Sequence, residues 1–523
     1  MGITWRSRAV SAAAPLALAL LAAGCVGTSD APSPGPSASS APSASSAPSA
    51  SSAPSDGAPA ARVCAKPAAG PAKAPAGAVT VDPAVVGDLA AKTRDSPAHT
   101  TFWLRPGKHR LEPDRYSQVV PKEGNRYLGA PGAVLDGRKT NRYAFGGTAR
   151  DVTIGHLTVR GFAAPHDEGV VNHDSADGWV IEHATVRDNS GAGLMAGDRQ
   201  QVRASCLRDN GQYGLNAYKG DGTINDLVLE GNEITGNNTG DWERKRPGCG
   251  CTGGVKFWAV EGADIRGNWV HDNRGTGLWA DTNNNDFLIE DNVIESNDGA
   301  ALIYETSYNA VVRENTIRRN NWVEGRENTD GGDNFPFATV YISESGGEPR
   351  VEARTDKIEI YRNVLEDNWS GITLWENADR FCNSPANTSS GDCTLLVKDI
   401  ERCARPAIGK APLYDDCRWK TQRVDVHDNR FLLDKTVVEC TSNCDRMALL
   451  ANYGTYPDWS PYQGERVAEA ITHRQDNRWH DNVYVGPWKF VAHDPSRVLD
   501  FGQWRGAPYR QDAGSTLRAR DGG

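Results

Sequence analysis

A repeat of short β-type units constrains this chain more than any other feature of its sequence. The segments 265–278 and 289–302 carry Asn, Gly and apolar residues in the same order, 24 residues apart. Further copies, at a period of 21 to 24 residues, lie at 186–194, 207–215, 232–237, 315–320 and 363–368, with partial copies around Asn429 and Asn482. One unit of this size cannot bury its own apolar face, so successive units must stack as coils.

Asn residues mark matched corners of these units. We expect them to adopt left-handed backbone angles and to hydrogen-bond along the stack. The pattern resembles the right-handed parallel β-helix repeat of the pectate-lyase-like superfamily over about residues 100–490. The resemblance implies an all-β solenoid, and many members of the superfamily bind and cleave polysaccharides. Leucine-rich repeats are excluded because the L-x-x-L-x-L spacing is absent.

The N-terminus is typical of an export signal. Arg6 and Arg8 precede an apolar stretch, Ala9–Ala23, that is too short to span a bilayer. The sequence Leu-Ala-Ala-Gly-Cys ending at Cys25 resembles a bacterial lipobox, although the family usually has Leu where Ala22 stands. We therefore predict a lipoprotein signal peptide over residues 1–24 and lipidation of Cys25. The alternative is an ordinary secretory signal cleaved nearby.

A stalk is expected after the signal peptide. From Ala31 to Ser55 every residue but Gly35 is Ala, Ser or Pro, which leaves nothing to bury in a core. We assign residues 25–78 to this stalk and residues 79–523 to the β-helix. An extended stalk would carry the folded part away from the membrane on the outer side of the cell.

Two insertions interrupt the period, at about 321–338 and 379–420. The second begins a run of six cysteines, Cys382, Cys393, Cys403, Cys417, Cys440 and Cys444. Export permits disulfides, so we expect these cysteines to pair, in a connectivity that the sequence leaves open. Zinc is the alternative, but CxxC pairs and neighbouring His are missing.

The chemistry is expected on one outward column of the solenoid. Each unit has two corner Asn residues. The residue five positions after the second of them is apolar and is expected to point inward, so the residues six and eight positions after it should point outward. At the eighth position the units carry Tyr218, Trp258, Asp281, Glu305, Glu344 and Glu376 in order, and at the sixth Lys256 and Trp279. Coils are spaced about 4.8 Å apart, so four such carboxylates would repel one another unless they serve a purpose.

Glycoside hydrolysis is the purpose that we favour for this column. It needs two carboxylates, about 5 to 5.5 Å apart in retaining enzymes and about 6.5 to 9.5 Å apart in inverting ones. We predict Asp281, Glu305, Glu344 and Glu376 as the catalytic carboxylates, with Asp281 and Glu305 the preferred pair. Tyr218, Lys256, Trp258, Trp279 and Tyr304 are the expected substrate-binding residues, because aromatic rings suit sugar faces.

Two alternatives remain open. A polysaccharide lyase or epimerase would use the carboxylates to hold calcium and Lys256 as base, as the superfamily's calcium-dependent lyases do. A non-catalytic glycan-binding protein would use only the aromatic face. The hydrolase needs no cofactor. The formal charge of −10 argues against nucleic acid as a partner, and we expect a monomer attached to the membrane through its lipid.

Overall fold

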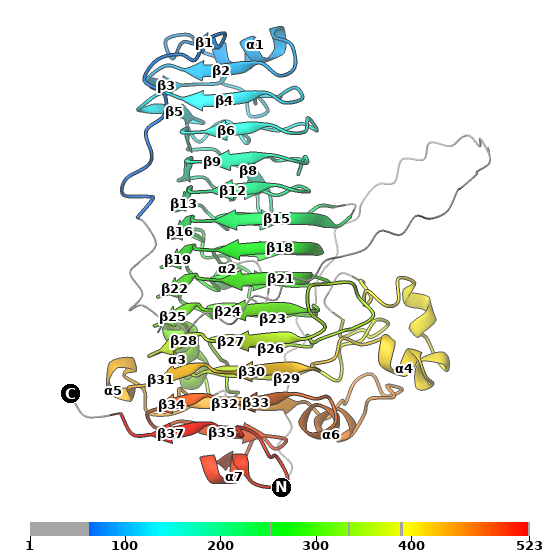
Figure 1. Cartoon of the computed structure of the whole chain (residues 1–523). Helices are drawn as coiled ribbons and strands as arrows, with labels where there is room; N and C mark the ends of the chain where they lie inside the picture. The colour runs from blue at the N-terminus through cyan, green and yellow to red at the C-terminus, as the bar shows by residue number, and fades with distance from the viewer. Residues whose placement is uncertain are drawn as a thin grey trace, which may run out of the picture. The chain divides into compact units, whose positions relative to one another are not determined.

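The computed structural model describes residues 62–520, apart from 221, 248, 251–252, 333–334 and 388–390. The predicted signal peptide, Cys25 and the stalk up to residue 61 lie outside the described residues. The described part forms three long sheets whose strands stack coil upon coil, which confirms the predicted all-β parallel solenoid (Figure 1). In the described ranges, no helix combines the length and the apolar character that crossing a membrane requires.

Sheet A and sheet B each contain thirteen strands, and every pair of neighbouring strands in them is parallel. Sheet A consists of β1 (Val79–Val81), β2 (Thr101–Leu104), β4 (Arg126–Gly129), β6 (Thr153–Gly155), β9 (Val180–Glu182), β12 (Gln201–Arg203), β15 (Ile224–Glu230), β18 (Val260–Arg266), β21 (Asn285–Glu290), β24 (Ala310–Arg313), β27 (Ile358–Tyr361), β30 (Val424–His427) and β33 (Arg478–His480). Sheet B consists of β3 (Gly107–His109), β5 (Ala133–Asp136), β7 (Thr158–Arg160), β10 (Thr185–Arg187), β13 (Cys206–Arg208), β16 (Glu233–Thr235), β19 (Trp269–His271), β22 (Val293–Glu295), β25 (Thr316–Arg318), β28 (Val364–Glu366), β31 (Arg430–Leu432), β34 (Val483–Val485) and β37 (Thr516–Arg518).

Sheet C contains eleven strands and carries the predicted column on its outer face. Its strands are β8 (Gly169–Val171), β11 (Ala192–Met195), β14 (Leu215–Ala217), β17 (Val255–Phe257), β20 (Leu278–Ala280), β23 (Leu302–Glu305), β26 (Val340–Ser343), β29 (Ile372–Glu376), β32 (Arg446–Ala451), β35 (Lys489–Ala492) and β36 (Val498–Leu499). Only the last pair, β35 and β36, is antiparallel. From the coil of β6, β7 and β8 to that of β33, β34 and β35, each coil contributes one short strand to each sheet.

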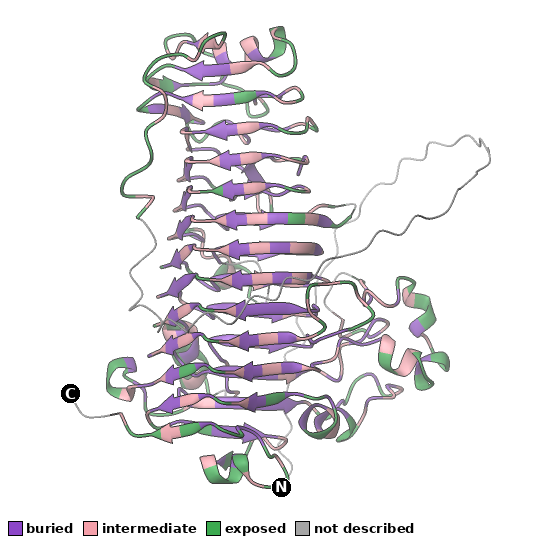
Figure 2. Cartoon of the chain, viewed as in Figure 1, coloured by how far each residue is buried: buried purple, intermediate pink, exposed green. Residues whose placement is uncertain are grey.

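Helices occur only outside the regular coils of the described part. They are α1 (Asp88–Asp95), α2 (Trp242–Lys245), α3 (Trp322–Asp330), α4 (Leu413–Asp416), α5 (Lys435–Val438), α6 (Arg466–His473), α7 (Phe501–Arg505) and two 3₁₀ turns (Ile400–Cys403 and Ala407–Gly409). The first predicted insertion contains α3, and the second contains the 3₁₀ turns and α4. Figure 2 shows the strands mostly buried, whereas α4, α5 and α7 consist mainly of exposed or half-buried residues.

The core runs along the inside of the stack. The predicted inward positions Leu194, Leu215, Leu278 and Leu302 pair in register between neighbouring coils, through Val255, and are at most 1% exposed. Burying one such side chain contributes about 1.5 to 3 kcal/mol, but only when the next coil covers it.

Two asparagine ladders hold the corners, as predicted. In one of them Asn237 donates to Asn273 at 3.0 Å, and Asn273 donates to Asn297 at 2.9 Å. The left-handed conformation, however, falls on the residue before each ladder Asn, such as Asp272 (φ 53°) or Ser296 (φ 55°). The Asn side chain can therefore turn inward and bond the coils on either side.

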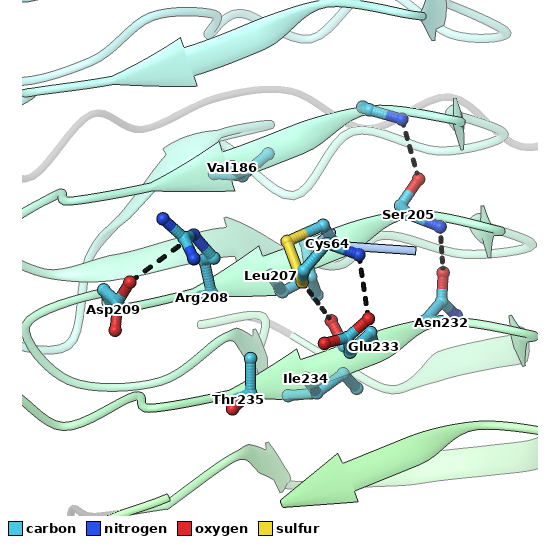
Figure 3. Close-up of a disulfide and its surroundings, with 12 residues drawn as sticks. Cys64, Val186, Ser205, Leu207, Arg208, Asp209, Asn232, Glu233, Ile234 and Thr235 are labelled. Atoms are coloured by element: carbon cyan, nitrogen blue, oxygen red, sulfur yellow. Dashed lines mark hydrogen bonds and ion pairs between the residues drawn. A yellow bond between two sulfur atoms is a disulfide. The ribbon is translucent and has the colours of Figure 1, made fainter. Parts of the chain in front are cut away.

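Residues 62–78, which we call the N-terminal strap, lie against the solenoid rather than in the predicted stalk. Cys64 forms a disulfide with Cys206 of β13, and its N–H donates to Glu233 at 2.8 Å (Figure 3). Further along the strap, Trp103 donates from Nε1 to the carbonyl of Pro71 at 2.9 Å. The prediction failed here because Cys64 has its partner 142 residues away, in a strand that the composition of the strap does not reveal.

Candidate active site

The outer face of sheet C brings Lys256, Trp279, Asp281 and Glu305 together. Lys256 pairs in register with Trp279, and each of the two carboxylates follows a paired residue at the same step of neighbouring coils. The predicted stacking of Asp281 on Glu305 therefore agrees with the register of β20 and β23.

Asp281 is held by a lysine. Lys256 Nζ lies 2.7 Å from Asp281 Oδ2 and 3.9 Å from the centre of the Trp279 ring, above its face. The ammonium group also donates to the carbonyl of Gly250. An ammonium this close stabilises the anionic carboxylate, and the indole face supports the cation. Asp281 is thus held in a fixed position, as a base or nucleophile must be.

Glu305 is held from two sides. Trp279 Nε1 donates to its Oε2 at 3.1 Å, and Arg380 Nη1 lies 2.5 Å from its Oε1. The side chains of Asp281 and Glu305 remain 14% and 15% exposed, so both keep a path to solvent. Trp279 joins the two carboxylate environments, since its ring contacts Lys256 and its N–H contacts Glu305.

Glu344 and Glu376 do not continue the column, which corrects the sequence prediction. Ser343 pairs with Glu305, and Trp375 pairs with Ser343, so both glutamates lie one step further along their strands. Their side chains are only 2% and 1% exposed. For Glu376 the count failed because the corner from Asn368 to Ile372 is one residue shorter than the corner from Asn297 to Leu302. For Glu344 it failed because the insertion separates Val340 from the corner at Asn320.

Glu344 lies beneath Arg380, which reaches Glu305 as well. Arg380 Nε is 3.7 Å from Glu344 Oε1, and Ser343 donates its hydroxyl to the other carboxylate oxygen. Burial raises the pKa of Glu344 to about 7, although Arg380 opposes the rise and Glu305 adds to it. Near neutral pH this carboxyl can therefore hold a proton next to the exposed pair.

Glu376 has a structural environment. It forms a buried ion pair with Arg418, and it accepts from the N–H of Thr421 at 3.0 Å and from Gln475 at 2.7 Å. All of these partners come from the end of the cysteine-rich insertion or from beyond it. The carboxylate therefore fastens the insertion to β29 and has no path to a substrate.

The predicted aromatic residues divide between the two faces of the sheet. Tyr218 is 43% exposed and contacts Trp258 edge to face, with ring centres 6.4 Å apart. Tyr304 is a correction, because it points into the core at 1% exposure and donates its hydroxyl to the carbonyl of Tyr308 at 2.6 Å. Tyr304 lies two residues after the inward Leu302, so strand alternation turns it inward as well.

The cysteine-rich insertion supplies residues that the sequence prediction missed. The disulfides Cys382–Cys393, Cys403–Cys417 and Cys440–Cys444 confirm that the six cysteines pair. Asn283 donates to the carbonyl of Cys393 at 2.7 Å, which holds the insertion beside the column. Burial, and then the charge of Asp281, raises the pKa of Asp392. The available signal was that charged residues adjoin or nearly adjoin the cysteines.

A second group of missed residues lies on the other side of Lys256. His166 Nδ1 is 2.6 Å from Asp167 Oδ2, and Gln212 donates to Asp167 at 2.7 Å. Burial works to raise the pKa of Asp167, but these bonds and the charge of Lys256 lower it overall. Burial raises the pKa of Tyr213, with smaller contributions from Asp167 and Asp281. This group therefore extends the polar site beyond Lys256.

Metal binding has no counterpart at the column. Among the described residues, two groups of side chains lie close enough to share one ion: Glu465, Glu469 and His493, and the disulfide-bonded Cys382, Cys393 and Cys403. Neither group includes Asp281 or Glu305. Calcium therefore remains a prediction of the lyase alternative.

Comparison with known proteins supports the fold. Residues 169–355 match the family model described as "Right handed beta helix region". With its three parallel sheets, the chain is an all-β right-handed parallel β-helix. No curated protein sequence matches it.

Solved structures with similar coils have low sequence identity to this chain. The A-module of mannuronan C-5 epimerase AlgE4 from Azotobacter vinelandii has a TM-score of 0.45 at 14% identity, over 86% of this chain and 97% of that one. The catalytic unit of a GH87 alpha-1,3-glucanase from Streptomyces thermodiastaticus has a TM-score of 0.39 at 13% identity, over 86% and 69%. The Agl-KA catalytic domain has a TM-score of 0.43 at 10% identity, over 87% and 70%. Likenesses this distant carry no argument about the activity of this chain.

Proposed function

We propose that this protein is a carbohydrate-active enzyme that binds a polysaccharide along the outer face of sheet C and hydrolyses a glycosidic bond there. One observation carries the proposal: Asp281 and Glu305 lie at the same step of neighbouring coils, each partly exposed and each in contact with Trp279 or its lysine partner. Paired carboxylates beside aromatic rings are the groups that glycoside hydrolysis needs.

The two carboxylates take different roles. Asp281, beside the ammonium of Lys256, attacks the anomeric carbon or activates a water. Glu305, in its protonated form, donates its proton to the oxygen of the leaving sugar, and Arg380 and Trp279 stabilise the carboxylate that results. Neighbouring coils are spaced about 4.8 Å apart, which suits a retaining reaction in which Asp281 first forms a covalent glycosyl intermediate. Glu305 then takes a proton from the water that releases this intermediate, and the site returns to its starting state.

Glu344 supports Glu305 in this scheme. Its carboxyl, with a pKa of about 7, shares the guanidinium of Arg380 with Glu305. When Glu344 is protonated, it no longer competes as an anion for Arg380, and the guanidinium interacts more strongly with Glu305. Glu344 is therefore a positioning residue beneath the acid.

A lyase or epimerase is the second candidate, favoured by the cations at the site. Lys256 and Arg380 both contact the exposed carboxylates, and a uronate carboxylate could compete for either cation. Such an enzyme would remove the proton next to that carboxylate. A lyase would then release unsaturated products that absorb ultraviolet light, and an epimerase would leave the chain length unchanged.

The test is a substrate screen followed by conservative amide variants. Asp281→Asn and Glu305→Gln should each lower kcat at least about a hundredfold, because acid–base catalysis contributes about 10² to 10⁴ in rate. Asp458→Asn, on an exposed loop, is the matched control and should keep full turnover. Near-normal turnover in both site variants would refute the assignment. Glycan binding without any cleavage in the wild type would favour a non-catalytic binding protein.

For location, we propose attachment to the outer face of the cell membrane through a lipid on Cys25. The support is the sequence of residues 1–25, which resembles a lipoprotein signal.

A further inference from the structure

A cavity lies between α4 and α6, on the edge of the solenoid that carries the cysteine-rich insertion. Its volume is about 370 Å³, within the range of small-molecule sites. Four cations line it, Arg418, Lys420, Arg466 and Arg474, whereas Asp415 is its one acidic lining residue. Such a gathering is unexpected on a chain with a formal charge of −10.

One of the lining residues, Arg418, is buried and held in place by its neighbours. The side chain of Arg418 is 6% exposed, held by Glu376 and by Gln475 Oε1 at 3.3 Å. Its Nε is buried and has no hydrogen-bond partner among the described residues.

The wall formed by α6 leaves room for a ligand. Arg466, Ala470 and Arg474 follow one another at intervals of four residues, so they share one face, with the small residue between the two cations. Arg466 bonds a backbone carbonyl, that of Pro461, at 3.0 Å, and the nearest carboxylate to Arg474 is Glu469 at 3.9 Å. Both guanidinium groups can therefore turn to an anion without breaking a strong ion pair.

We infer that this cavity is an anion-binding subsite that takes the carboxylate, sulfate or phosphate group of an acidic sugar. Guanidinium groups recognise such oxyanions through paired N–H donors. Arg418 and Gln475 also bond Glu376, the last residue of β29, so the cavity adjoins the end of a sheet C strand. That the anion is carried by a glycan rests on the proposed function, whereas the binding of an oxyanion rests on the cavity alone.

The test measures binding to the full chain by calorimetry at low ionic strength. The probes are glucuronate, galacturonate, glucose 6-sulfate and glucose 6-phosphate, with glucose, inorganic sulfate and inorganic phosphate for comparison. We expect at least one acidic sugar to bind and glucose not to bind. Ala470→Glu, which fills the cavity with an acid, should weaken that binding at least tenfold, and so should Arg466→Ala combined with Arg474→Ala. Arg505→Ala on α7 is the matched control and should bind as the wild type does.

Each other outcome overturns part or all of the inference. Absence of binding by every acidic probe, or unchanged binding by folded cavity variants, would refute the subsite. Binding of the inorganic ions alone would refute its assignment to a glycan. Asp281→Asn separates this inference from the proposed function, because that variant should lose turnover and still bind the acidic sugar in the cavity.

Discussion

The disulfide between Cys64 and Cys206 should protect the first coils of the solenoid. Replacing both cysteines with Ala cuts a loop of 142 residues that contains every strand from β1 to β12. In the chain-entropy relation, a loop of that length corresponds to about 5 kcal/mol at 25 °C, whereas the four-residue separation of Cys440 and Cys444 corresponds to about 2 kcal/mol.

The loss of stability should be concentrated in the N-terminal coils of the solenoid. Coils of a solenoid contact only their neighbours, so an untied end opens without unfolding the rest. About 5 kcal/mol corresponds to a factor of several thousand in an opening equilibrium. Hydrogen exchange read by mass spectrometry should therefore show amide protection falling by up to that factor in residues 79–205, with little change in residues 424–492.

The control removes Cys440 and Cys444 in the same way. Its effect should be smaller and should stay near α5. Amide protection of residues 79–205 within tenfold of the wild type after loss of Cys64 and Cys206 would refute the reasoning. It would show that bonds such as that from Trp103 to Pro71 already hold the strap without the covalent link.

Two further predictions concern the anchor and the buried acid. Cys25→Ser should move the protein from the membrane fraction to the medium, and a variant that stays with the membranes after a high-salt wash would contradict the lipid anchor. Glu344→Gln should change the pH dependence of the melting temperature. Because the folded pKa is raised from 4.5 to about 7, the wild type loses stability as the pH rises through this interval. The variant should thus gain on the wild type between pH 5 and pH 8, and parallel melting curves would count against a proton on Glu344.

The solenoid was predictable because its repeat is local. The alternation of inward and outward residues around Leu278 and Leu302 predicts the fold, and it also predicts that Asp281 stacks on Glu305. The same rule failed at Glu376, where the corner after Asn368 is one residue shorter, and at Glu344, where the insertion before Val340 interrupts the count. Tyr304 failed for a different reason, since the alternation itself places it inside.

The arginine partners of Glu305 and Glu376 could not be predicted from the sequence. Arg380 meets Glu305 across 75 residues and Arg418 meets Glu376 across 42, both from an insertion that has no period. The sequence predicted that the cysteines of this insertion pair, but it left their connectivity open. The positions of Arg380 and Arg418 could therefore not be predicted. Because disulfides and bonds such as that of Asn283 to Cys393 fix the insertion, the cations reach the column at defined positions.

Charge compensation explains why the repeat and the insertion have to act together. Stacked coils place like residues above one another, so acids on one face repel unless cations intervene. Within the repeat, Lys256 serves Asp281 from the neighbouring coil. For Glu305, Glu344 and Glu376 the cations come from the insertion, as Arg380 and Arg418. Loss of the two disulfides within the insertion, Cys382–Cys393 and Cys403–Cys417, should therefore expose the acids at the site while the coils remain stacked. In this molecule the coils set the spacing of the carboxylates, and the insertion sets which of them stay exposed to a substrate.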